Sequence, residues 1–394
     1  MILHLVHDEK IINRTIDVFE TVFPKENLFV VFTRKKFKFV REGKNIFAYQ
    51  DFEKNKEDFK VTAIIIHYMN SRKMDFVNKL YPPRIPVYWI IWGADLYNKL
   101  LEPKGFEMID KKSAYQSRNL TKILSLPYNK IREKVRTKKN IKFINERVNY
   151  IVTDTTENDY DMLIQYYPQL RHIPWKDFFY YPIDVVLGEE LIEKYIDGDN
   201  IQIGNSASLT NNHEYAINIL SKLNIKNRKV IIPLSYSGSE SYKKYVINCG
   251  NKLIGNNFTP LTDFIPLQEY NKLLTSINVA IYGNWRQEAI GNIIISLYLG
   301  AKVFLSYRTP VLQWAQNHNL IVFELEKITQ NDIDTPLSRE DKEHNRQILL
   351  KLYNKERLYK LIKDGFKEKK HEKINNLAIP IRNAKYARSN YRKK

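Results

Sequence analysis

The sequence contains a single cysteine, Cys249, and no run of about 18 apolar residues. One cysteine excludes an internal disulfide and a cysteine-based zinc cluster, which is typical of a reducing compartment. The opening residues, MILHLVHDEK, carry an apolar run that is too short for a signal peptide, because His4 and His7 interrupt it. We therefore expect a cytoplasmic protein without a membrane-spanning segment.

Several ligand-binding motifs are also missing. Neither GxxxxGK[ST] nor GxGxxG occurs, which disfavours P-loop kinases and simple dehydrogenases. Two DxD triplets, at 197–199 and 332–334, could hold a divalent ion only at the end of a strand. The first precedes its strand and the second lies in a polar stretch, so both are predicted to be turns. We expect neither a required metal nor a cofactor.

Basic residues are abundant. The 63 lysines and arginines exceed the 44 acidic residues by 19, which favours an anionic partner such as phosphate, nucleic acid or an acidic membrane. Residues 122–147 hold nine of these cations against Glu133 and Glu146, interleaved with Ile131, Val135 and Phe143. This pattern is typical of a helix lying on an anionic leaflet, with an ordinary solvated helix as the alternative.

Short runs rich in β-branched and aromatic residues alternate with amphipathic stretches, and these runs predict strands. They occupy residues 1–7, 28–33, 61–68, 87–92, 148–154, 201–206, 229–236, 278–283 and 301–306. Strands that are apolar on both faces and separated by helices indicate parallel sheets covered on both sides. At 394 residues the chain exceeds one ordinary core, so we predict two doubly wound α/β domains.

The predicted seam lies near residue 182, where Pro182 and Gly188 interrupt the pattern. The domains are then 1–182 and 183–358, and the basic segment 359–394 is expected to return to the first domain. Ligands of open α/β sheets bind beyond the carboxyl ends of the strands, so we expect a cleft between the two domains.

Two segments of the second half are suited to phosphate. In IQIGNS, Gly204 allows close backbone approach, while Asn205 and Ser206 offer donors; an ordinary turn with a helix cap at Thr210 is the alternative. In the segment 278–306, Arg286 and Glu288 precede an apolar helix. The amino end of that helix favours a diphosphate, Arg286 could bind the same group, and Glu288 could accept the ribose hydroxyls or cap its own helix.

Three residues of the first half are candidates for a general base. Asp95 follows the strand 87–92 and the Gly93 turn, although it could instead be the amino cap of a helix at 96–101. His67 ends the run AIIIH and could equally be a buried core histidine. Asp8, after the first strand, is the third candidate.

Six blocks in order, spanning about residues 65 to 305, resemble the TDP-N-acetylfucosamine:lipid II N-acetylfucosaminyltransferases, glycosyltransferase family 56. They are IIIHYMN, WIIWGADLY, YYPIDV, IGNSASLTNNHE, IIPLSY and RQEAIGN with LYLGAKVFL, of which WGADLY is the most specific. The resemblance implies a GT-B fold, with the nucleotide-sugar donor on the second domain and the acceptor on the first. It also implies inverting transfer to an undecaprenyl-diphosphate-linked saccharide at the inner face of the plasma membrane.

Carried over by residue, the resemblance assigns the donor diphosphate to two loops and places Tyr236 beside the nucleotide. The loop residues are Gly204, Asn205, Ser206, Arg286, Gln287, Gly291 and Asn292. Glu288 departs from the glutamine of the family but resembles the ribose-binding glutamate of GT-B enzymes at large.

Two other functions compete with glycosyl transfer. The excess of 19 positive charges would suit a nucleic-acid-binding protein, yet zinc-finger, RRM and helix-turn-helix signatures are lacking, so we expect no nucleic-acid partner. A GT-B-like sugar-nucleotide epimerase would need the donor alone. We predict a glycosyltransferase whose partners are a nucleotide sugar, a lipid-diphosphate-linked acceptor and an anionic membrane surface.

Overall fold

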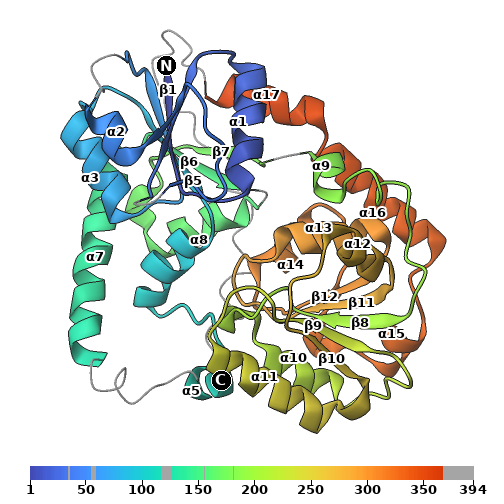
Figure 1. Cartoon of the computed structure of the whole chain (residues 1–394). Helices are drawn as coiled ribbons and strands as arrows, with labels where there is room; N and C mark the ends of the chain where they lie inside the picture. Colours follow the sequence, from blue (N-terminus) through green and yellow to red (C-terminus); the bar gives the residue numbers. More distant parts are fainter. Residues whose placement is uncertain (34–35, 55–58, 117–125, 155, 181, 367–394) are drawn as a thin grey trace.

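Two α/β domains make up the protein, each built on one parallel sheet with helices on both faces (Figure 1). The computed structural model describes residues 1–33, 36–54, 59–116, 126–154, 156–180 and 182–366. Alternate residues of a strand enter different hydrophobic clusters: Leu3 and Leu5 lie on one face of the first sheet, and Ile2 and Val6 on the other. Burial on both faces is what the continuous apolar runs predicted, and the α/β prediction is confirmed.

The first sheet has the strand order β3-β2-β1-β4-β5-β6-β7, with every pairing parallel. Its strands are β1 (Ile2–Val6), β2 (Asn27–Val31), β3 (Ile46–Ala48), β4 (Ala63–His67), β5 (Val87–Ile91), β6 (Tyr150–Asp154) and β7 (Trp175–Phe178). The chain reverses its direction of winding between β1 and β4. A crevice at the carboxyl ends of these strands is where such sheets bind ligands.

The helices of the first domain connect these strands. They are α1 (Ile11–Val22), α2 (Tyr49–Lys54), α3 (Ser71–Leu80), α4 (Ala94–Leu96), the π-helical turn Tyr97–Leu101, α5 (Lys111–Gln116), α7 (Leu126–Arg147) and α8 (Asn158–Tyr166). Asn70 begins α3 as an amino cap, since its side chain accepts a hydrogen bond from Lys73 N. The long helix α7 stands at the outer edge of the domain (Figure 1).

The second sheet has the order β10-β9-β8-β11-β12-β13 and is also parallel. Its strands are β8 (Asn200–Ile203), β9 (Val230–Pro233), β10 (Phe258–Leu261), β11 (Ile277–Tyr282), β12 (Lys302–Leu305) and β13 (Phe323–Glu324). The helices are α9 (Ile183–Leu187), α10 (His213–Leu220), α11 (Glu240–Leu253), α12 (Leu267–Thr275), α13 (Ile290–Leu299), α14 (Pro310–Asn317), α15 (Gln330–Asp334) and α16 (Arg339–Leu352). Here the winding reverses between β8 and β11.

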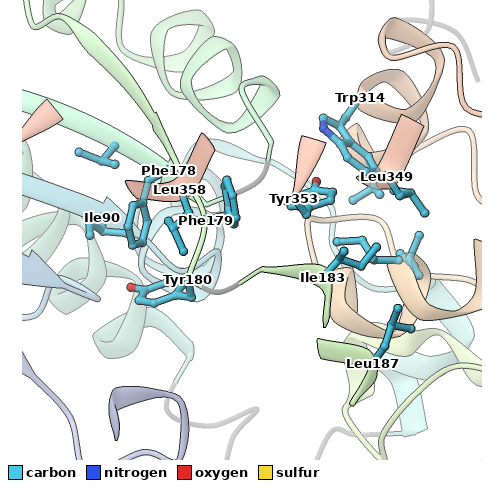
Figure 2. Packing of buried hydrophobic residues seen from close by; sticks show 14 of the residues in the cluster. Ile90, Phe178, Phe179, Tyr180, Ile183, Leu187, Trp314, Leu349, Tyr353 and Leu358 are labelled. Carbon is cyan, nitrogen blue, oxygen red and sulfur yellow. The ribbon is translucent and has the colours of Figure 1, made fainter. Parts of the chain in front are cut away.

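Within the described residues, the chain crosses between the domains twice. The segment after β7 leads into α9, and the segment after α16 leads into α17 (Lys355–Gly365), which packs on α1 and β7 of the first domain. Ile183 N donates to Tyr353 O at 2.8 Å, so the two crossings lie side by side. Figure 2 shows the apolar side chains that line them, with Phe178 and Leu358 on one side and Trp314 and Leu349 on the other.

Residues 359–366 of the predicted returning segment therefore contact the first domain. Phe366, just after α17, lies with its ring centroid 5.4 Å from that of Phe19 and 5.1 Å from that of Tyr88. The remainder of the predicted tail, 367–394, lies outside the described residues.

Candidate active site

The two predicted donor loops meet in the second domain, because β8 and β11 are neighbours in its sheet. Glu288 connects them: its Oε2 accepts hydrogen bonds from Thr210 Oγ1 at 2.5 Å and Asn284 Nδ2 at 3.0 Å. Arg286 Nη2 lies 3.2 Å from the same oxygen. The amino cap of α13 is Ala289, with no side-chain capping bond, so Glu288 joins the loops and does not cap its helix.

The turn after β8 needs glycine at its first position. Gly204 has φ +67°, and a Cβ there would lie 2.5 Å from Asn211 Oδ1. That oxygen instead accepts a hydrogen bond from Asn205 N at 2.9 Å, while Ser206 Oγ accepts one from Ser208 N at 3.3 Å. The side chain of Asn211 thus fixes the backbone of the loop.

Four buried polar atoms of these loops have no hydrogen-bond partner among the residues that the structure describes: Asn205 Oδ1, Asn284 Oδ1, Trp285 Nε1 and Arg286 Nε. Leaving such an atom unpaired costs about 1 to 3 kcal/mol, and most buried polar atoms are therefore paired. These four atoms lie in two adjoining loops at the carboxyl edge of the sheet. A polar ligand bound there could supply the missing hydrogen bonds.

The other predicted donor residues border the same edge. Tyr236 follows β9; its backbone oxygen accepts from Ala207 N at 2.8 Å, and its side chain is 71% exposed. Gly291 lies in the first turn of α13, and a Cβ there would meet no atom within 4 Å. Asn292 accepts a hydrogen bond from Tyr270 OH at 3.0 Å. The amino end of α13 is consequently open beside Gly291.

Asp95 lies opposite, in the first domain, and its carboxylate is fully buried. Its Oδ2 accepts from Met69 N and from Trp89 Nε1, both at 2.8 Å, and its Oδ1 accepts from Trp92 N at 2.9 Å. Burial raises the pKa of Asp95, although these three bonds partly offset it. Gly93 is the amino cap of α4, so Asp95 joins the ends of β4 and β5 and is not the predicted helix cap.

The loop that carries Asp95 touches the predicted donor loop of the second domain. A Cβ at Gly93 would lie 2.5 Å from Gln287 Oε1 and 3.3 Å from Arg286 Nη1. Asn212 forms a second connection, since its Nδ2 donates to Gly283 O at 3.0 Å and its Oδ1 accepts from Asp110 N at 2.8 Å. The structure thus brings the loop of Asp95 against Arg286 and Gln287, which sequence analysis placed in separate domains.

His67 is in the interior of the first domain. Its Nδ1 lies 2.9 Å from Tyr180 OH and its Nε2 lies 3.2 Å from His4 Nδ1, while His4 Nε2 lies 3.2 Å from Asn27 Oδ1. Burial lowers the pKa of His67 well below its usual value and that of His4 to about 3. His67 therefore matches the buried-histidine alternative.

These histidines predict acid sensitivity. The unfolded chain binds a proton at His4 below about pH 6.5, whereas the folded chain does so only near pH 3, so stability falls as the pH drops through that window. For His4 alone the loss between pH 7 and pH 5 is about 2 kcal/mol. Urea unfolding of the wild type and of His4→Gln at both pH values tests this. An equal loss in both proteins would contradict it.

Asp8 is bound to the loop after β2. Its oxygens accept hydrogen bonds from Lys38 N at 2.6 Å and from Phe39 N and Val40 N, both at 2.9 Å. Burial raises the pKa of Asp8, but these backbone bonds outweigh that effect and lower it. The carboxylate thereby holds the shape of this loop.

Sequence analysis missed two lysines near Asp95. Lys99 Nζ donates to Met69 O at 2.8 Å and lies 4.0 Å from the centroid of the Tyr68 ring. Lys73 is fully buried, and its Nζ donates to His67 O at 2.5 Å and to Tyr68 O at 3.2 Å. Burial lowers the pKa of both. The four-residue spacing of Asp95 and Lys99, one helical turn, was the available signal.

The acidic triplet at 332–334 has local partners. Asp332 completes a capping box with Thr329 at the start of α15, and Asp334 lies 2.8 Å from Lys226 Nζ. Within the described ranges, no group of three or more His, Cys, Asp or Glu side chains is arranged to hold a metal ion. In the same residues, none of the helices has the length and apolar character needed to cross a membrane.

Comparison with known proteins identifies the family. The model of the family described as 4-alpha-L-fucosyltransferase, glycosyl transferase group 56, matches residues 142–351, a little more than half of the chain. The structure of Alr3699/HepE from Anabaena in complex with UDP matches with a TM-score of 0.61 and 13% identity over 92% of this chain and 99% of that one.

Two further solved structures share the fold. A glycosyltransferase from Rickettsia africae ESF-5 has a TM-score of 0.58 and 12% identity, covering 91% of this chain and 95% of its own. WaaG, a glycosyltransferase involved in lipopolysaccharide biosynthesis, has a TM-score of 0.53 and 8% identity over 92% and 98%. The predicted GT-B fold is confirmed, and the chain belongs to glycosyltransferase family 56.

Proposed function

We propose that the protein transfers a sugar from a nucleoside diphosphate to a saccharide carried on undecaprenyl diphosphate, at the inner face of the plasma membrane, in bacterial surface polysaccharide synthesis. The observation that carries this proposal is the junction of Glu288, Arg286 and Thr210 at the carboxyl edge of the second sheet, directly across from Gly93 and the Asp95 loop. This arrangement supports a donor on one side of the cleft and an acceptor on the other.

The donor's diphosphate would bind Arg286 and the open amino end of α13. A guanidinium and a helix amino end both stabilise phosphate charge, so they would balance the charge of the leaving diphosphate without a divalent ion. All hydrogen bonds that the structure gives the Glu288 side chain end on Oε2, which leaves Oε1 as our candidate acceptor for the ribose hydroxyls. The exposed side chain of Tyr236 would border the base.

Asp95 is our candidate for the base that takes the proton of the acceptor hydroxyl. Among the three predicted candidates its loop contacts the donor loop, through Gly93. Both carboxylate oxygens hold hydrogen bonds, so one of these bonds would open when the acceptor binds. Attack by the hydroxyl oxygen on the anomeric carbon, with the nucleoside diphosphate leaving from the opposite face, would invert the configuration.

Glu288→Gln tests the proposed ribose contact. We expect nucleoside diphosphate binding to weaken by about 1 to 3 kcal/mol, because the amide loses an anionic acceptor and its ion pair with Arg286. Isothermal titration measures the change. Asp332→Asn is the matched control, since Asp332 is also ion-paired and lies near Lys302, at the amino end of β12. Equal affinities in wild type and Glu288→Gln would exclude the contact.

Helix α7 is the proposed membrane contact. Ile131 and Val135 lie one turn apart and are 64% and 62% exposed, with cationic Lys134 and Lys138 exposed beside them. Apolar side chains flanked by cations suit an anionic leaflet. We expect the double variant Ile131→Glu and Val135→Glu to lose sedimentation with phosphatidylglycerol vesicles while keeping nucleotide affinity. Undiminished sedimentation would contradict the assignment of this face.

A further inference from the structure

A concave site lies away from the candidate active site, between the last turns of α3 and α7. The cavity has a volume of about 460 Å³ and includes Tyr81, Lys142 and Arg147 in its wall. Tyr81 follows α3 and precedes β5, and Arg147 ends α7 just before β6. The cavity is therefore at the amino ends of the strands, the edge of the sheet opposite the candidate active site.

Arg147 is the one buried charged residue among those lining this cavity. It is only 9% exposed, and its Nη2 donates to Tyr81 O at 3.2 Å. Its Nε and Nη1 are buried, and neither has a hydrogen-bond partner in the described ranges of the chain; the same holds for Tyr81 OH. Across the described part of the chain, no carboxylate forms a salt bridge with Arg147. A buried guanidinium is costly unless an anion pairs with it.

The rim of the cavity adds positive charge. Lys142 is exposed, and Lys139 lies 2.7 Å from Asp75 across the gap between the helices. Glu146, also at the rim, is the one acidic residue among those lining the cavity. Because Asp75 already pairs with Lys139, Lys142 and Arg147 against Glu146 leave one excess positive charge at the cavity. This excess favours an anion, and the guanidinium and phenol donors suit phosphate oxygens.

The cavity continues the face of α7 that we propose to contact the membrane. Residues 131, 135, 138 and 142 are spaced by four, three and four, so they share one side of the helix. This side runs from the exposed Ile131 and Val135 to Lys142 in the cavity wall. A phosphate group bound in the cavity could therefore be that of a lipid in the leaflet that α7 is proposed to contact.

We propose that this cavity binds the phosphate of an anionic phospholipid headgroup, with Arg147 and Tyr81 as its donors. The inference rests on the proposed membrane contact of α7 but not on the proposed donor and acceptor. A single headgroup held by a buried guanidinium would fix the orientation of α7 on the leaflet. Attraction between exposed cations and an anionic surface does not fix an orientation.

Sedimentation with phosphatidylcholine vesicles, with and without phosphatidylglycerol, tests the proposal. Loss of one ordinary surface cation weakens binding to anionic vesicles by about fivefold, and Lys134→Gln, outside the cavity, serves as that reference. We expect Arg147→Gln to lose more than 20-fold, about 1.8 kcal/mol at 1.4 kcal/mol per tenfold change. Tyr81→Phe removes no charge, and we expect it to lose more than threefold.

The outcomes separate the explanations. The headgroup site is overturned if Arg147→Gln binds vesicles no more weakly than Lys134→Gln and Tyr81→Phe binds them no more weakly than the wild type. If Arg147→Gln does not fold, the comparison of Tyr81→Phe with the wild type decides. Inorganic phosphate could raise the melting temperature of the wild type but not that of Arg147→Gln. If the two proteins then bind vesicles equally well, the cavity holds soluble phosphate and the lipid assignment fails. Nucleoside diphosphate affinity, measured on the same variants, reports separately on the proposed donor site.

Discussion

Replacing Arg286 with alanine is expected to weaken nucleoside diphosphate binding by about 1.5 to 3 kcal/mol, the value of a hydrogen bond to a charged group. The transfer rate should fall by about 100- to 1,000-fold, as when a preorganised donor to developing charge is removed. Arg286 Nη2 lies 3.2 Å from Glu288 Oε2, and Arg286 Nε is buried without a hydrogen-bond partner in the described part of the chain. Titration calorimetry and a product assay measure the two effects.

Arg228→Ala is the matched control for this prediction. The Arg228 side chain is 11% exposed, as is that of Arg286, and it also pairs with a carboxylate, at 3.6 Å from Asp334. Arg228 precedes β9, at the opposite edge of the sheet from the donor loops. We expect it to keep nucleotide affinity. Equal losses in the two variants would assign the Arg286 effect to stability, and no loss in Arg286→Ala would remove Arg286 from the donor site.

Asp95→Asn is expected to lower the transfer rate by about 100- to 10,000-fold while sparing nucleotide binding, because general base catalysis contributes that much. The amide cannot take a proton from the acceptor hydroxyl, and one of its two polar atoms no longer accepts a hydrogen bond. Initial rates at saturating donor, with nucleotide affinity measured in parallel, test this. Near-normal turnover would rule out Asp95 as the base.

The pH profile separates a base from a residue that only holds its loops. Because burial raises the pKa of Asp95, the rate should fall as the pH drops through that raised value and the carboxylate is protonated. Asp8→Asn is the comparison, since the Asp8 carboxylate also accepts three hydrogen bonds, all from backbone N–H groups of the loop at 38–40. If Asp8→Asn lowers the transfer rate as much as Asp95→Asn does, the loss of rate does not identify Asp95 as the base.

The central strands could be predicted from sequence because both of their faces are buried. Four edge strands could not. In β7, WKDF, Trp175 is 38% exposed, and its neighbours Lys176 and Asp177 interrupt any apolar run. Strands β3 and β13 have three and two residues, and β10 contains Pro260. Short or polar edge strands are fixed by the neighbour they pair with, which local sequence does not encode.

The position of the candidate site was partly predictable, because it lies at the ends of central strands that sequence predicts. That Gly204, Arg286 and Glu288 lie at one edge of the sheet could be predicted, because each follows a strand that the pattern predicts and the carboxyl ends of parallel strands converge. The hydrogen bond from Trp89 Nε1 to Asp95 depends on a side-chain conformation, and the contact of Gly93 with Gln287 depends on how two domains dock. Neither is a property of a local segment, so neither could be predicted from the pattern.

The most direct test of the donor site is a thermal-shift titration of the purified wild-type protein with TDP, UDP, GDP, CMP and a mixed oligonucleotide, with EDTA present. We predict that a nucleoside diphosphate raises the melting temperature without a metal. At 100 times its dissociation constant the ligand stabilises the folded state by about 2.7 kcal/mol. No rise with any nucleotide, together with a salt-sensitive rise with the oligonucleotide, would contradict the proposed donor site and favour nucleic-acid binding.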